Sequence, residues 1–154
     1  YRQLDNNIKK QHPLVIVGAH GWNVSLANLI KKYKLEGHIK LLGFVNDYEL
    51  AYIYSKAKIL AMPSLYEGFG LPILEAFKFG IPVLTSHTSS MPEVLGKGGI
   101  TVSPLNQKSI TEGLNKLLTD EKLYADCCQH IKRQLSKFSW DKASKLHWKV
   151  FMDC

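Results

Sequence analysis

Two carboxylates and two glycines lie close together near the middle of the 154-residue chain. Glu67 precedes Gly68 and Gly70, and Glu75 follows Glu67 by eight positions. Glycines let a phosphate approach the backbone, and the free N–H groups at the start of a helix attract an anion. Carboxylates repel phosphate but accept hydrogen bonds from hydroxyl groups. The segment therefore fits a ligand with hydroxyl groups on either side of a diphosphate, which is a nucleotide sugar.

The residues after Gly68 indicate where a helix starts. Pro72 suits the first helical turn, because the N–H that it lacks would have no partner within the helix. The N–H groups of Phe69, Gly70 and Leu71 then remain free for a diphosphate. A simpler alternative is that the glycines only form a turn and that Glu75 only complements the helix dipole, an effect of about 0.3–1 kcal/mol. That alternative is the better one for Glu75 alone, but it does not account for the whole segment.

Alternating apolar runs and helical spacing predict the elements that position this segment. Short runs rich in branched residues predict buried strands at residues 14–17, 39–42, 59–62, 83–85 and 100–102. Segments with apolar residues at helical spacing lie between these strands, as parallel pairing requires. The sequence therefore predicts an α/β, Rossmann-like fold, a parallel sheet with helices on both faces. Such sheets bind ligands at the carboxyl ends of their strands, where the glycine segment lies.

The two ends of the chain have helical patterns. Apolar residues at helical spacing predict helices over residues 110–118 and 123–135, and Ser139 is suited to cap a third. Residues 1–11 have the pattern of the end of a helix. We expect one truncated domain over residues 1–154, which opens inside a βα unit.

Composition argues against several other classes of protein. The longest apolar runs fall far short of the roughly 20 residues of a membrane-spanning helix, and the start does not resemble a signal peptide. Cys127, Cys128 and Cys154 lack the spacing of a disulfide framework or a zinc site, so we expect a cytoplasmic setting. The net charge of +7 comes mostly from lysine, since Arg2 and Arg133 are the arginines. Without a basic run interleaved with aromatic residues, nucleic acid is not an expected partner.

Several cations gather near the end of the chain and leave a membrane contact open. They are Lys132, Arg133, Lys137, Lys142, Lys145 and Lys149. Such a group attracts anionic lipid and would allow peripheral contact with the inner face of the membrane. The alternative is that these side chains only solvate two helices.

The segment 63–76 resembles the signature of the retaining GT-B glycosyltransferases often called family four, or group 1. It reads Pro-Ser-x-x-Glu-Gly-Phe-Gly-Leu-Pro-x-x-Glu-Ala, with Glu67 and Glu75 as its two acidic residues. Further likeness occurs at residues 14–18, 43–50, 80–83, 89–94 and 138–140, in the order of that family's carboxyl-terminal domain. The resemblance covers nearly the whole chain and implies one half of a GT-B fold.

The resemblance implies a role for each residue of the glycine segment. Glu67 would be the catalytic residue and contact the hydroxyl groups of the donor sugar, and Glu75 would bind the ribose hydroxyls. Gly68 and the N–H groups of residues 69–71 would hold the diphosphate. A loop with Gly43 and Val45 would lie beside the base, although both residues fit a simple turn at a strand end equally well.

Two further polar residues, Glu93 and His87, are candidates for the same pocket. Glu93 fits a loop at the start of a helix better than the donor pocket. His87 lies in the polar loop 86–90, where it either points toward the crevice or is simply solvated.

The resemblance also implies a mechanism, in which a hexosyl group passes to an acceptor hydroxyl with retention of anomeric configuration. The departing diphosphate would help to deprotonate the acceptor. The chain has no Asp-x-Asp pair, so we expect no metal and no cofactor besides the nucleotide-diphosphate sugar, which is the donor substrate. The family's diphosphate-binding arginine and lysine, and its acceptor-binding amino-terminal domain, would precede Tyr1. We expect the isolated 154 residues to be inactive without that domain as partner.

Two other functions stay open at the level of sequence. A noncatalytic nucleotide-binding or interaction module would keep the fold without the reaction, although intact Glu67 and Glu75 argue against it. A nucleotide-sugar epimerase of the same fold would need catalytic acids from the amino-terminal domain. The sequence identifies neither the base, the sugar nor the acceptor.

Overall fold

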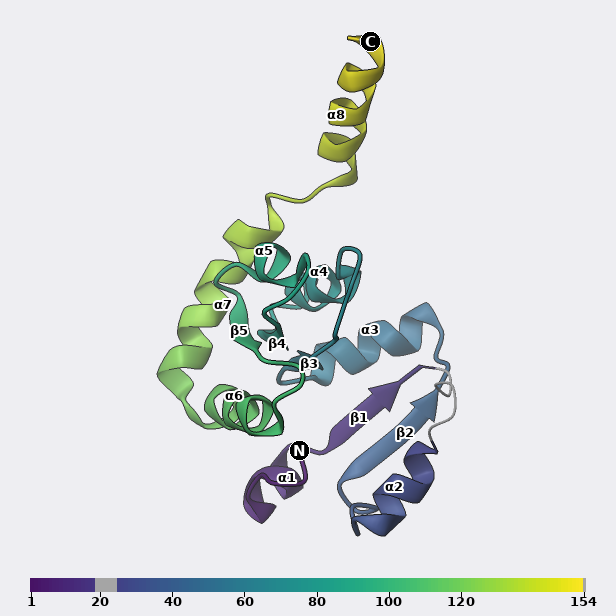
Figure 1. Cartoon of the computed structure of the whole chain (residues 1–154), viewed down its shortest axis with the longest axis vertical. Helices are drawn as coiled ribbons and strands as arrows, with labels where there is room; N and C mark the ends of the chain where they lie inside the picture. Colours follow the sequence, from purple (N-terminus) through teal and green to yellow (C-terminus); the bar gives the residue numbers. More distant parts are fainter. Residues whose placement is uncertain (19–24, 154) are drawn as a thin grey trace.

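The computed structural model describes residues 1–18 and 25–153, in which strands and helices alternate as predicted (Figure 1). Its strands are β1 (Leu14–Val17), β2 (Ile39–Gly43), β3 (Leu60–Met62), β4 (Val83–Ser86) and β5 (Gly99–Val102). Its helices are α1 (Asn6–Gln11), α2 (Leu26–Lys32), α3 (Asp47–Lys56), α4 (Leu71–Lys78), α5 (Met91–Leu95), α6 (Gln107–Thr119), α7 (Glu121–Leu135) and α8 (Trp140–Met152). Every predicted strand is present, with ends that differ by at most one residue.

The strands pair in parallel, as predicted, but they form two sheets. β1 pairs with β2, while β4 lies between β3 and β5. The prediction of a parallel sheet specified no strand order, and in the described residues no ladder of hydrogen bonds joins β1 to β3. The sheets also differ in burial. β4 is buried at every position, whereas Val15 in β1 is 36% exposed.

Helices cover both faces of the β3–β4–β5 sheet. Side chains alternate between the two faces of a strand, so Val83 and Leu84 of β4 belong to different apolar clusters. Val83 packs in a cluster with Ile73 and Phe77 of α4, to which α3, α5 and α7 also contribute. Leu84 packs with Leu117 of α6 and with side chains of α7 and the amino-terminal segment. The predicted layering is confirmed for this sheet.

Helix α1 corrects the interpretation of residues 1–11 as the end of a helix. It starts at Asn6, where Asp5 caps it by accepting a hydrogen bond from the backbone N–H of Asn7 at 2.7 Å. Before the cap, Leu4 is 5% exposed and packs in the cluster that contains Leu84. A short polar cap is enough to start a helix, so the segment before it remains available for packing.

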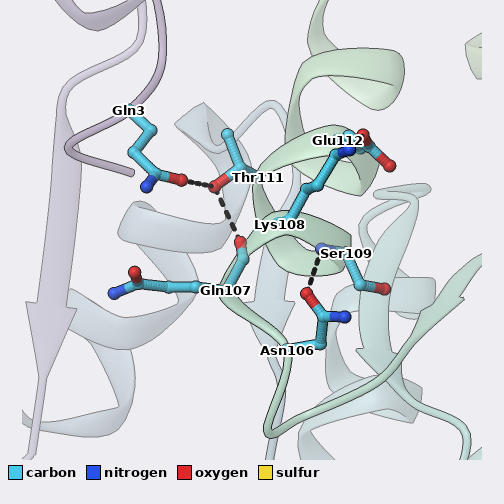
Figure 2. Close-up of polar contacts among 7 residues, drawn as sticks. All are labelled: Gln3, Asn106, Gln107, Lys108, Ser109, Thr111 and Glu112. Carbon is cyan, nitrogen blue, oxygen red and sulfur yellow. Dashed lines mark hydrogen bonds and ion pairs between the residues drawn. The ribbon is translucent and has the colours of Figure 1, made fainter.

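The start of α6 lies against the amino-terminal segment (Figure 2). Asn106 caps this helix by accepting a hydrogen bond from the backbone N–H of Ser109 at 3.1 Å. The Thr111 hydroxyl lies 2.8 Å from the carbonyl oxygen of Gln107 and 3.0 Å from Oε1 of Gln3. The contact between Thr111 and Gln3 joins residues that are 108 positions apart in the chain.

Helix α8 projects away from the rest of the molecule (Figure 1). It begins at the predicted cap, where Ser139 accepts a hydrogen bond from the backbone N–H of Lys142 at 3.1 Å. None of its residues is buried, and Trp140 and Phe151 are 81% and 75% exposed. Among the described helices, none combines the length and the apolar character needed to cross a membrane.

The cysteines in the described residues both belong to α7. Cys127 is buried and Cys128 is half-buried, each as a free thiol. Cys154 lies outside the described residues.

Candidate functional site

The glycine segment forms the loop 63–70, which connects the carboxyl end of β3 to α4, as predicted. Gly70 caps α4 with a φ of +93° and is buried. Residues with a Cβ rarely adopt that backbone conformation. A Cβ on Gly70 would also lie 3.2 Å from Cδ1 of Ile73. The backbone conformation therefore favours glycine here, and an added Cβ would also require Ile73 to shift by a few tenths of an ångström. Pro72 occupies the first turn of α4, as predicted.

The backbone of this loop offers free hydrogen-bond donors. The N–H groups of Phe69, Gly70 and Leu71 donate to no other group among the described residues. Phe69 and Leu71 are 42% and 49% exposed, whereas Gly70 between them is buried. Gly68 is exposed, and a Cβ there would meet no described atom within 4 Å. Free N–H groups at the start of a helix form an anion site.

Each predicted carboxylate has one hydroxyl partner and keeps acceptor capacity for others. Glu67 is half-buried, and its Oε1 accepts a hydrogen bond from the Ser64 hydroxyl at 2.8 Å. Glu75, also half-buried, accepts one from the Tyr54 hydroxyl of α3 at 3.1 Å. A carboxylate has about four acceptor positions, so both side chains can still bind hydroxyl groups of a ligand.

Tyr54 is held in place as a donor to Glu75. Its ring stacks on Phe79 with 5.6 Å between the ring centroids. Burial, followed by the negative charge of Glu75 and the hydrogen bond to it, raises the pKa of Tyr54 well above its usual value of 10. The phenol therefore stays protonated at neutral pH and donates to the carboxylate.

Gly43 and Val45, the residues expected beside a base, lie at the carboxyl end of β2. Gly43 has a φ of +65°, and its carbonyl oxygen accepts a hydrogen bond from the N–H of Gly18 at 2.8 Å. Val45 lines an open groove together with side chains of α3. The other groove residues are Leu42, Phe44, Tyr48, Glu49, Tyr52 and Ile53. This loop belongs to the other sheet, and in the described residues no hydrogen bond joins it to the loop 63–70.

Glu93 and His87, the two further candidates, lie outside the loop 63–70. Glu93 lies exposed in the first turn of α5, as expected for a residue at the start of a helix. His87 is exposed, and its Nδ1 atom lies within hydrogen-bond distance, 2.9 Å, of the carbonyl oxygen of Val102 in β5. The interpretation of His87 as simply solvated is incomplete for that reason.

Sequence reasoning missed Ser64 and Tyr54. Ser64 was part of the quoted signature, three positions before Glu67, and that spacing was the available signal. Tyr54 reaches Glu75 across 21 positions, and no local pattern indicates such a contact. No cluster of three His, Cys, Asp or Glu side chains suited to a metal occurs in residues 1–18 and 25–153.

The sequence matches the family described as "Glycosyl transferases group 1" over residues 1–134. The chain is 35% identical over 145 residues to O-antigen chain mannosyltransferase B of Escherichia coli. That match covers 94% of this chain but only 38% of the relative. The chain therefore spans well under half of the length of this relative.

Solved structures share the fold. HepE of Anabaena in complex with UDP superposes with a TM-score of 0.84 at 20% identity, over 99% of this chain and 43% of that chain. The same protein has been solved with UDP-glucose, with a TM-score of 0.80 at 20% identity over 96% of this chain and 44% of that chain. The C-terminal domain of LpcC, a group 1 family protein of Francisella tularensis, has a TM-score of 0.64 at 28% identity. That match covers 73% of this chain and 59% of that chain. These likenesses show the α/β fold of GT-B glycosyltransferases.

Proposed function

Because the chain belongs to the group 1 glycosyl transferases, we propose that residues 1–154 are the donor-binding domain of a hexosyltransferase. This enzyme transfers a glycosyl group from a nucleotide-diphosphate sugar to an acceptor hydroxyl. The loop 63–70 carries the proposal, since it presents free N–H groups at the start of α4 between two half-buried carboxylates. UDP and UDP-glucose in HepE, and the mannosyltransferase name of the Escherichia coli relative, support a donor of this class.

The diphosphate binds to the N–H groups of Phe69, Gly70 and Leu71, with Gly68 leaving room for its approach. These donors lie at the positive end of the α4 dipole. As the sugar departs, negative charge grows on the diphosphate, and fixed N–H groups stabilise that charge without having to reorganise. Metal-independent catalysis is consistent with this arrangement.

The two carboxylates bind the hydroxyl groups on either side of the diphosphate. Glu67 is the catalytic residue and contacts the donor sugar, with its carboxylate restrained by Ser64. Glu75 binds the ribose while Tyr54 occupies one of its acceptor positions. Transfer proceeds with retention, and the departing diphosphate helps to remove the proton of the acceptor hydroxyl. Gly43 and Val45 lie beside the base.

The acceptor site belongs to an amino-terminal domain of the same enzyme. The greater length of the relatives supports this division, since this chain spans 38% of the mannosyltransferase. The reaction takes place in the cytoplasm. Lysines of α7 and α8 favour peripheral contact with anionic lipid at the inner face of the membrane.

A binding titration tests the donor site directly. The 154-residue chain is titrated with UDP, GDP and ADP and with their sugars, and we expect one of the diphosphates to bind. Glu75→Gln weakens that binding by about tenfold, because it removes a charged acceptor of ribose hydroxyl groups. Glu112→Gln, on the exposed surface of α6, is the matched control. If a folded chain bound none of these nucleotides, the interaction-module alternative would be favoured.

A further inference from the structure

A run of hydroxyl residues lies along the loop 63–70. The hydroxyls of Thr85 and Ser86 in β4, and of Thr88, Ser89 and Ser90 between β4 and α5, all donate to backbone carbonyl oxygens of the segment 62–69. Thr85 donates to Met62 at 2.9 Å, Ser86 to Ser64, Thr88 to Leu65 at 3.1 Å, and Ser89 to Glu67 at 2.5 Å. Ser90 lies 3.0 Å from the carbonyl oxygen of Phe69 and 3.2 Å from that of Glu67.

These contacts continue the pairing of β3 with β4 beyond the end of the strand. The backbone ladder ends where Met62 lies opposite Thr85, 23 positions later in the chain. Each hydroxyl contact after that point keeps a separation of 21 to 23 positions. Side-chain donors thus replace backbone donors where the loop is no longer extended.

The contacts of Ser89 and Ser90 determine where the N–H groups of the loop point. In a trans peptide unit the C=O and the N–H point in opposite directions, and the described residues contain no cis peptide bond. A carbonyl of Glu67 that faces Ser89 directs the N–H of Gly68 away from it. In the same way, a carbonyl of Phe69 that faces Ser90 directs the N–H of Gly70 away from Ser90. The glycines have no side chain that would hold these peptide units by packing.

The backbone conformation at Ser89 would favour glycine, so its hydroxyl contact explains why a serine stands there. Ser89 has a φ of +58°, a left-handed conformation that glycine adopts without steric cost and serine does not. Ser89 is also exposed, so core packing does not favour a side chain there. The 2.5 Å contact with the Glu67 carbonyl is the interaction that a glycine would lose.

We propose that Ser89 and Ser90 are positioning residues for the donor, which hold the peptide units after Glu67 and Phe69 so that their N–H groups meet the diphosphate. They act through the loop and do not touch the donor. This inference rests on the proposed function, which places the diphosphate at the N–H of Gly70, and it adds the N–H of Gly68 to the same site.

The test compares Ser89→Gly, Ser90→Ala and the double variant in the 154-residue chain. The probes are the tightest-binding of UDP, GDP and ADP and the corresponding monophosphate. We expect the double variant to bind the diphosphate about tenfold more weakly and to lose most of the preference for diphosphate over monophosphate. Ser89→Gly removes the hydroxyl, so we expect it to weaken diphosphate binding. Because it also relieves the backbone strain at this position, it should not lower the midpoint of thermal unfolding. Ser90→Thr keeps the hydroxyl and restores binding.

Two results would overturn the inference. An unchanged preference for diphosphate in a folded double variant would leave the proposed function standing and show that the hydroxyls have only a structural role. If the unchanged chain bound none of the diphosphates, the proposed function and this inference would fail together. Ser144→Ala, at a hydroxyl on exposed α8, is the matched control and should bind as the unchanged chain does.

Discussion

The loop after β3 and the loop after β2 occupy equivalent places in their sheets but differ in how they are held. Both follow the carboxyl end of a parallel strand and adjoin a glycine with positive φ, since the first loop ends at Gly70 and the second follows Gly43, the last residue of β2. The first loop lies beside β4, a strand buried at every position, and receives several hydroxyl contacts from the segment 85–90. The second borders an open groove where Phe44 and Tyr48 are 87% and 90% exposed.

This difference shows which loop can serve as a rigid part of a site. Fixed donors stabilise a developing charge only if their directions are set before the ligand arrives. The buried sheet and the hydroxyl contacts provide this for the loop 63–70. The loop after β2 has less packing of its own, so we expect it to contribute to affinity more than to catalysis.

The largest expected effect comes from Glu67→Gln in the complete enzyme. We expect kcat to fall by about 100-fold or more, because the carboxylate that we propose to contact the donor sugar loses its charge. Val45→Ala in the second loop should raise KM by about twofold, since it removes apolar surface that we propose to lie beside the base. Steady-state kinetics with the donor varied measures both. Equal losses of kcat in the two variants would contradict the contrast between the loops.

The next effect is on stability and compares the two glycines. Gly70→Ala should lower the free energy of unfolding by about 2–3 kcal/mol, because a strained φ adds to the close contact with Ile73. Gly43→Ala should lower the free energy of unfolding by about 1 kcal/mol, which is the cost of the positive φ alone. The added Cβ would meet no described atom within 4 Å. Urea denaturation followed by circular dichroism measures the difference. A larger cost at Gly43 would show that the second loop is the more constrained one.

A smaller effect is expected from Ser64→Ala. The variant removes the 2.8 Å hydrogen bond to Glu67, and we expect kcat/KM of the complete enzyme to fall by about tenfold. The free energy of unfolding should change by less than about 1 kcal/mol, because Glu67 is only half-buried. Ser64→Thr, which keeps the hydroxyl, is the control, and equal losses in both variants would argue against this role of the hydrogen bond.

The smallest effect concerns pH and the contact between α3 and Glu75. The pKa of Tyr54 is raised in the folded chain, chiefly by burial and then by Glu75. The unfolded chain therefore loses the Tyr54 proton at a lower pH than the folded chain does. The resulting stabilisation is complete below pH 10 and is lost as the pH rises above that value. Tyr54→Phe should thus make the loss of stability above pH 10 less steep.

The matched control for this pH effect is Tyr48→Phe, at a side chain that is 90% exposed beside the second loop. It should leave the slope of stability against pH unchanged. Denaturation midpoints between pH 9 and pH 11.5 measure both variants. Equal slopes for Tyr54→Phe and the unchanged chain would show that the Tyr54 proton is not linked to folding.

Local chemistry along the chain was sufficient to predict most of the elements and the centre of the candidate site. Apolar runs predicted β1 to β5 within one residue at either end, because side-chain periodicity follows from backbone geometry. Gly70 and Pro72 indicated where α4 starts, because glycine permits a positive φ and proline fixes φ near the helical value. Ser139 marked the start of α8 in the same way.

Contacts between distant segments were decided only by the tertiary structure. Tyr54 reaches Glu75, and Ser89 and Ser90 reach the loop 63–70, across 21 to 23 positions. These contacts depend on the register in which β3 and β4 pair and on how α3 packs. No residue pattern within one of the contacting segments encodes them. The same reason applies to the division into two sheets. Periodicity identifies a strand, but its neighbours follow from how the whole chain packs.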